Sequence, residues 1–157
     1  MTFENNKITG SNDTKARRKE WIGLLGSADP QWLEQQKERL GLNLTPDFMV
    51  RPETGMIMMQ ARQDGAGPRF NLGEVTVSRC ILKLDGVIGY AMVMGSNLRH
   101  AKLAALFDAM FQMPDSGSDL RKNLVPELRR RQKERRDNEA RDVRSSKVEF
   151  FTMKRGE

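Results

Sequence analysis

The chain has 157 residues, 38% hydrophobic and 31% charged, with a formal net charge of +6. This length is typical of one domain with a sizeable core. The single cysteine, Cys80, excludes an internal disulfide framework and suits a reducing compartment. The N-terminus lacks the apolar region of a signal peptide, and no apolar stretch approaches the ~20 residues of a membrane span. We therefore predict a soluble cytoplasmic protein without a membrane segment.

We predict four regions along the chain. Residues 1–12 are polar and rich in Asn, which is typical of a disordered arm. Residues 13–113 are expected to form an α+β core domain. Residues 114–147 are expected to form a linker and a basic helical segment. Residues 148–157 read as a C-terminal strand that docks onto a partner.

Two helices are predicted at the start of the core domain. Apolar residues at spacings near 3.6 indicate a helix capped by Asp13 and ending at Gly26. A second helix is indicated by Asp29 as its N-cap, Pro30 in its first turn and Gly41 at its end. Its apolar stripe is weak, so we expect it to lie on the surface or against a partner.

Strand-forming residues concentrate in the middle of the chain. They predict strands over residues 56–62, 74–84 and 87–94, with a short first strand at 47–50 that Pro52 closes. The connection between the strands at 62 and 74 is longer than a tight turn needs, so we interpret it as a flexible or functional loop.

The dipeptide Asp85-Gly86 predicts a two-residue hairpin turn. This turn places Leu84 opposite Val87 and fixes the pairs that follow. One face of the hairpin is then lined by small side chains, which lets another element approach closely: Ser78, Cys80, Gly89 and Ala91. The other face carries Arg79 among apolar residues. Because neither face is cleanly polar, we expect the sheet to be covered on both sides.

The strongest amphipathic helix is predicted from Leu98 to about Gln112, capped by Ser96 or Asn97. We expect it to cover the sheet. In the basic segment that follows, Pro126 either begins or kinks a helix. The predicted fold class is α+β: an antiparallel sheet of hairpins covered by helices, with N-terminal helices and a long basic C-terminal helix.

The positive charge is concentrated near the C-terminus, since residues 119–147 hold 11 basic and 6 acidic side chains. Residues 129–136 are a candidate nucleic-acid patch, which is our alternative function for the chain. Acidic residues interleave with this patch and aromatic residues do not. We therefore favour a solvated helix face, or a surface for an acidic partner, over nucleic-acid binding.

Three residues are weak candidates for chemistry. His100, the only histidine, lies near a helix N-terminus at the edge of an apolar stripe, and we favour a packed, hydrogen-bonded residue over a catalytic one. Arg79 is a catalytic or anion-binding candidate, although an internal ion pair with Glu53 or Glu74 is favoured. Arg69 ends a Gly-rich loop whose backbone donors suit an anion, but the loop lacks the ending of a phosphate loop.

The sequence shows no catalytic constellation. One cysteine and one histidine give no zinc-type ligand set, so we expect no metal site and no cofactor bound by this chain alone. We see no nucleophile–base pair, no paired carboxylates and no dinucleotide-binding fingerprint. Phe150, Phe151 and Met153 suggest a partner interface, because adjacent phenylalanines at a terminus favour aggregation unless they are covered. A subunit is therefore favoured over a free-standing enzyme.

Several segments resemble, in order and spacing, the G-subunit (PhnG) family of the bacterial carbon-phosphorus lyase system. The resemblance runs from about Asp13 to the C-terminus, and residues 112–141 depart from the family pattern. The matching segments are Arg51-Pro52-Glu53-Thr54-Gly55, Asn71 to Arg79, Gly89-Tyr90, Gly95, His100 to Ala109 and Val148 to Met153.

The resemblance implies a role in phosphonate catabolism. PhnG-like proteins act with the H, I and L subunits to replace the adenine of ATP by methylphosphonate, and they share a core complex with the J subunit. The family places the nucleosidase chemistry on the I subunit. The resemblance thus implies an accessory subunit of a transferase complex, with ATP and methylphosphonate as substrates of the complex. A further possibility is that Arg69, Arg79 and His100 border a nucleotide or phosphonate pocket shared with a partner.

Overall fold

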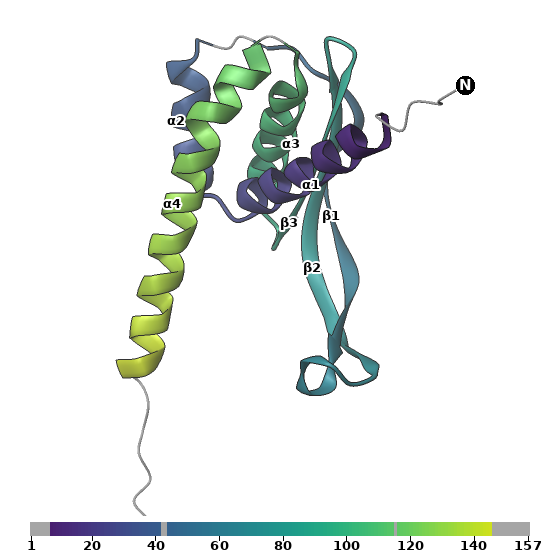
Figure 1. Cartoon of the computed structure of the whole chain (residues 1–157), viewed down its shortest axis with the longest axis vertical. Helices are drawn as coiled ribbons and strands as arrows, with labels where there is room; N and C mark the ends of the chain where they lie inside the picture. The colour runs from purple at the N-terminus through teal and green to yellow at the C-terminus, as the bar shows by residue number, and fades with distance from the viewer. Residues whose placement is uncertain (1–6, 42–43, 115, 146–157) are drawn as a thin grey trace, which may run out of the picture.

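The computed structural model describes residues 7–41, 44–114 and 116–145. The elements in chain order are α1 (Lys7–Gly26), α2 (Pro30–Arg39), β1 (Asp47–Arg62), the short 3-10 helix η1 (Gln63–Gly65), β2 (Arg69–Leu84), β3 (Val87–Met94), α3 (Leu98–Gln112) and α4 (Ser116–Ser145). The strands form an antiparallel sheet in the order β1-β2-β3. Helix α3 packs on this sheet. Helices α2 and α4 pack on the side of α3 that faces away from the sheet (Figure 1). The predicted α+β fold, with N-terminal helices and a long C-terminal helix, is confirmed.

The β2–β3 hairpin has the predicted turn and register. Asp85 and Gly86 have φ values of 48° and 84°, the positive values that a two-residue type I′ turn requires. Leu84 pairs with Val87, and the register continues unbroken along β3. The face of small residues is therefore formed as expected.

Helix α3 packs unusually close to that face. A Cβ atom on Gly89 would lie 2.1 Å from the carbonyl oxygen of Ala105, so only glycine fits there. The alanines of α3 that are buried in the core are Ala101, Ala104, Ala105 and Ala109. Because further helices pack behind α3, it is buried nearly all round rather than along a single stripe.

Helix α1 covers the free edge of β3. The Arg18 guanidinium donates to the carbonyl of Ile88 at 3.2 Å. At the end of the helix, a Cβ atom on Gly26 would lie 3.3 Å from the carbonyl oxygen of Met92. A covered edge cannot pair with another chain, so α1 protects this side of the sheet from aggregation.

Three predicted boundaries are wrong. Helix α1 begins at Lys7 rather than at Asp13, so residues 7–12 are helical. The short strand at 47–50 and the strand at 56–62 are one strand, whose register shifts on both sides of Val50 accommodate Pro52 at the sheet edge. Strand β2 starts at Arg69 rather than at 74, because its first residues pair with the end of β1.

Helix α2 has the predicted ends and a deeper position than predicted. The Asp29 carboxylate accepts a hydrogen bond from the backbone N–H of Gln31 at 2.9 Å, as an N-cap does. Trp32 and Leu33 are buried in the main core, so the helix is an integral part of the domain. Helix α4 runs through Pro126 without ending there, and buries Leu124 and Leu128.

The sheet face turned away from α3 is only partly covered. Ile81, Tyr90 and Met92 are half-buried on this face. Ile88 and Met94 are 46% and 66% exposed. Our prediction of a sheet covered on both sides is therefore wrong for the part of the chain that the structure describes. Within the same residues, no helix is both long and apolar enough to cross a membrane.

Candidate interaction surface

His100 occupies a packed position. Its side chain is buried, and its Nε2 atom lies 2.8 Å from the carbonyl oxygen of Leu25. Its backbone N–H donates to the Asn97 side chain, which caps α3. Burial holds the pKa of His100 below its ordinary value of 6.5, although the hydrogen bond to Leu25 acts in the opposite direction. These contacts join α1 to α3 and favour the packed interpretation.

The position of His100 predicts a pH dependence of stability. The unfolded chain binds a proton at the ordinary pKa and the folded chain only at a lower pH, so stability should fall as the pH drops below about 6.5. The carboxyl groups whose pKa is lowered, such as Glu20 and Glu34, reduce the stability only at lower pH, below about 4.5. Melting temperatures between pH 5 and 8 should show this loss for the wild type and not for His100→Gln. Parallel curves for the two proteins would exclude the effect.

Arg79 forms the expected ion pair. Its Nε donates to the Glu53 carboxylate at 2.6 Å, across the β1–β2 pairing. Both side chains are about half exposed, at 54% and 48%, so the pair lies at the surface rather than in an apolar interior. Of the two predicted partners within the chain, Glu53 and Glu74, the structure pairs Arg79 with Glu53, at the surface.

The structure does not bring Arg69, Arg79 and His100 together. Arg69 lies ten positions before Arg79 on β2, which corresponds to about 30 Å along the strand. His100 lies on α3, on the opposite side of the sheet from Arg79. This chain alone therefore does not form one small-molecule pocket bordered by all three residues. The N–H of Gly67, in the loop beside Arg69, donates to the carbonyl of Gln63 rather than facing a ligand site.

The buried polar side chains of the described residues bind one another and do not form a metal-binding group. No group of three or more His, Cys, Asp or Glu side chains among them is placed to hold a metal ion. Every buried side-chain nitrogen or oxygen that the structure describes has a hydrogen-bond partner, so none is left to face a ligand. Burial raises the pKa of the Cys80 thiol to about 11, which makes it a poor nucleophile.

Asp108 is the most connected buried polar residue of the described chain, and our sequence reasoning did not select it as a site residue. Its carboxylate is fully buried and accepts hydrogen bonds from Arg18 at 2.8 Å and from the Trp21 indole at 2.8 Å. It also accepts from the backbone N–H of Tyr90 and the side chain of Gln112. The carboxylate thus joins α1, β3 and α3, which is a structural role. The signal available in the sequence was a single acidic residue, Asp108, in a helix rich in apolar residues.

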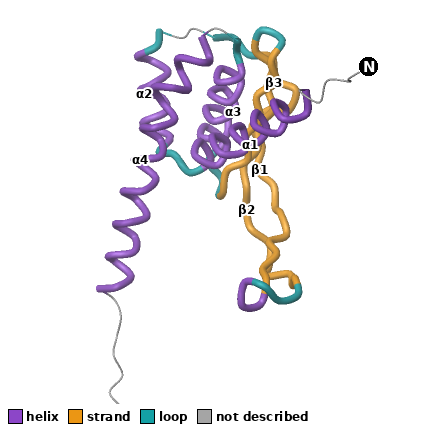
Figure 2. Tube along the Cα trace, viewed as in Figure 1, coloured by secondary structure: helices purple, strands orange, loops and turns teal. Residues whose placement is uncertain are grey.

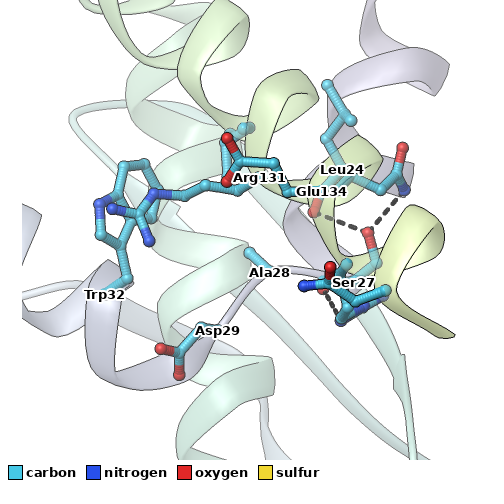
Figure 3. A pocket seen from close by; sticks show the side chains of 11 residues that line it. Leu24, Ser27, Ala28, Asp29, Trp32, Arg131 and Glu134 are labelled. Atoms are coloured by element: carbon cyan, nitrogen blue, oxygen red, sulfur yellow. Dashed lines mark hydrogen bonds between the residues drawn. The ribbon is translucent and has the colours of Figure 1, made fainter. Parts of the chain in front are cut away.

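Several arginines of the basic helix α4 contact other residues of the same domain. Arg129 binds Glu20 of α1 at 2.6 Å. Arg131 lies over the Trp32 ring of α2, 4.9 Å from its centroid, beside a cleft of about 260 Å³ (Figure 3). Hydrogen bonds from Arg130 and Arg131 lower the pKa of Glu127 to about 2. Because these guanidinium groups already have partners, the segment fits a solvated helix face better than a nucleic-acid patch.

What remains as a candidate functional feature is exposed apolar surface. It includes the outer sheet face, with Ile88 and Met94, and the distal part of the β1–β2 hairpin. Soluble domains rarely expose contiguous apolar surface, and such patches mark interaction sites. The other predicted interface, Phe150, Phe151 and Met153, lies outside the described residues and stays a prediction.

Comparison with known proteins gives one consistent result. The family model described as "Phosphonate metabolism protein PhnG" matches residues 16–156. The alpha-D-ribose 1-methylphosphonate 5-triphosphate synthase subunit PhnG of Rhizobium meliloti (strain 1021) is 40% identical over 111 residues, which cover 68% of each chain. The match covers the strands and helices described above except the first half of α1, and it confirms the resemblance found in the sequence. The chain belongs to the PhnG family of phosphonate metabolism proteins.

Proposed function

We propose that this chain is an accessory subunit of an α-D-ribose 1-methylphosphonate 5-triphosphate synthase. In this role it acts with H, I and L subunits, which transfer the ribose triphosphate of ATP to methylphosphonate and release adenine. It also belongs to a core complex that contains the J subunit. The chemistry takes place on its partners, and this chain contributes shape and contact surface.

The exposed apolar side chains on the outer sheet face are the observation that carries the proposal. Ile88 and Met94 expose apolar surface on a face that also holds half-buried Tyr90 and Met92. A partner subunit that covered this face would remove the surface from water, at about 25 cal/mol per Å² of apolar area. The printed name of the Rhizobium meliloti relative, a synthase subunit, supports the same conclusion.

Co-expression with the candidate partner subunits tests the proposal. We expect a tagged I subunit to retain this chain through purification, in one species whose native mass includes at least one copy of it. Met94→Asp, which places a charge in the contact face, should weaken this retention, because an unpaired charge is costly to bury. A chain that stays monomeric and ignores every co-expressed partner would exclude an accessory role.

A further inference from the structure

The β1–β2 hairpin extends well beyond the rest of the sheet. Strand β3 ends opposite Val77, so in the strand register the residues of β1 and β2 beyond that point pair only with each other, although the N–H of Gly95 still donates to the carbonyl of Thr76. We call residues 56–76 the arm. Figure 2 shows the arm projecting past α1, α2 and α3, in the same direction as the lower part of α4, as a two-stranded ribbon with η1 near its tip. An isolated two-stranded ribbon is only marginally stable in water, so a long arm of this kind calls for a second surface.

The arm exposes large apolar side chains on both of its faces. Met56 and Met58 point to the side that continues the core face, and they are 63% and 50% exposed. Phe70 and Leu72 are 48% and 60% exposed. Methionine adapts its shape to irregular apolar surfaces, which is why it is frequent in protein-binding sites. A ribbon that is apolar on both faces fits a groove better than a flat surface.

The arm is less suited to strand addition. Met59 pairs with Gly73 and Gln60 with Asn71, so Leu72 is an extra residue in a β-bulge. A bulge twists a strand edge and interrupts its row of donors and acceptors, which protects against pairing with another strand. Recognition of the arm therefore depends on its side chains rather than on its backbone.

The tip of the arm carries a like-charged pair. Arg62 and Arg69 lie directly opposite one another in the β1–β2 register. Arg62 donates to the carbonyl of Gly67 at 3.3 Å, and no described side chain forms an ion pair with either arginine. Like charges in directly opposed positions destabilise a strand pair unless an anionic group lies between them. The two arginines are therefore complementary to carboxylates.

We propose that the arm inserts into an apolar groove on a partner protein subunit, and that carboxylates at the end of this groove bind Arg62 and Arg69. The proposal rests on the accessory-subunit role and names the element that makes the contact. A second copy of this chain is a poorer occupant, because two arms side by side in the same direction would bring four guanidinium groups together.

A competition experiment in the assembled complex tests the proposal. The wild-type chain and a variant are co-expressed with the partner subunits, and mass spectrometry gives their ratio in the purified complex and in the lysate. The variant Met58→Glu/Leu72→Glu should be incorporated at least about tenfold less than the wild type, because buried apolar anchors carry most of the affinity of an interface. Arg62→Glu/Arg69→Glu should also be depleted. Val143→Glu, at a 72% exposed position on α4, is the matched control and should compete equally.

The outcomes separate this proposal from the function on which it rests. If the wild type itself does not join a complex, the accessory role fails. If the wild type joins and the arm variants join equally well, only the arm proposal is overturned. If the arm variants abolish a concentration-dependent dimer of the isolated chain and leave incorporation unchanged, the arm binds a second copy, which also overturns it. Should Met58→Glu/Leu72→Glu not fold, judged by its melting curve, Met58→Ser/Leu72→Ser serves the same comparison.

Discussion

Gly89→Ala should destabilise this protein more than any other single methyl group added to the sheet. The new Cβ atom would lie 2.1 Å from the carbonyl oxygen of Ala105 and 2.8 Å from the Cβ of Ala109. Both neighbours belong to α3. Other helices pack against the far side of α3, so it cannot shift away from the added methyl group. We expect the free energy of unfolding to fall by about 3 kcal/mol or more, since overpacking a core costs about 1–3 kcal/mol where the neighbours can move. The melting temperature should fall by about 6–12 °C.

Gly23→Ala is the matched control for this prediction. Gly23 lies inside α1, and an added Cβ atom would meet nothing within 4 Å. Alanine is favoured over glycine inside a helix by about 1 kcal/mol, so this variant should be as stable as the wild type or slightly more stable. Equal melting temperatures for Gly89→Ala and the wild type would show that α3 does not pack against β3 as described.

Asp108→Ala should cause the second large loss of stability. It removes the acceptor shared by Arg18, the Trp21 indole and the backbone N–H of Tyr90. A buried donor left without an acceptor costs about 1–3 kcal/mol, and breaking a buried ion pair from one side costs about 3–5 kcal/mol. We expect a loss of at least about 4 kcal/mol, which is a large part of the 5–15 kcal/mol typical of a domain. Chemical denaturation measures it.

Glu139→Ala tests whether the loss at Asp108 is specific to burial. Glu139 forms an exposed ion pair with Arg135 at 3.5 Å, with 66% of its side chain accessible. Exposed pairs contribute about 0–1 kcal/mol, so this variant should unfold near the wild-type denaturant midpoint. A small effect at Asp108, comparable to that at Glu139, would contradict the structural role assigned to the buried carboxylate.

Local patterns predicted the parts of the fold that local chemistry determines. Asp85-Gly86 fixes a two-residue turn, and the turn fixes every pair of the β2–β3 hairpin, because side-chain faces alternate strictly along a strand. Asp29 and Pro30 define the start of α2 for the same reason: capping involves residues close in sequence.

Contacts between distant residues were not predictable in the same way. Asp108 meets Arg18 and Trp21 across about 90 residues of sequence, and nothing in the local pattern pairs them. The β1 strand was divided in two because Pro52 reads as a strand terminator, whereas the irregular edge pairing tolerates it. The early start of β2 was missed because Arg69 and Phe70 belong to it only through their partners on β1.

For the candidate surface too, local features were predictable and features that depend on distant strand pairing were not. The sequence correctly indicated an ion pair of Arg79 with one of two carboxylates, Glu53 or Glu74, and the placement of His100 beside the apolar stripe of α3. Only the distal part of the arm, residues 64–73, was interpreted as a loop, since residues 69–73 carry glycine and asparagine and have little strand propensity. Its exposed apolar character follows only from the register, which shows that β3 ends at Met94, opposite Val77 of β2.

The most direct test of this account is adenine release from ATP in the presence of methylphosphonate. We expect the isolated chain to release none above the blank, the full set of subunits to release it, and the set without this chain to lose the activity. Adenine release by the isolated chain, or full activity of the partners without it, would contradict the proposal that this protein contributes contact surface while its partners perform the chemistry.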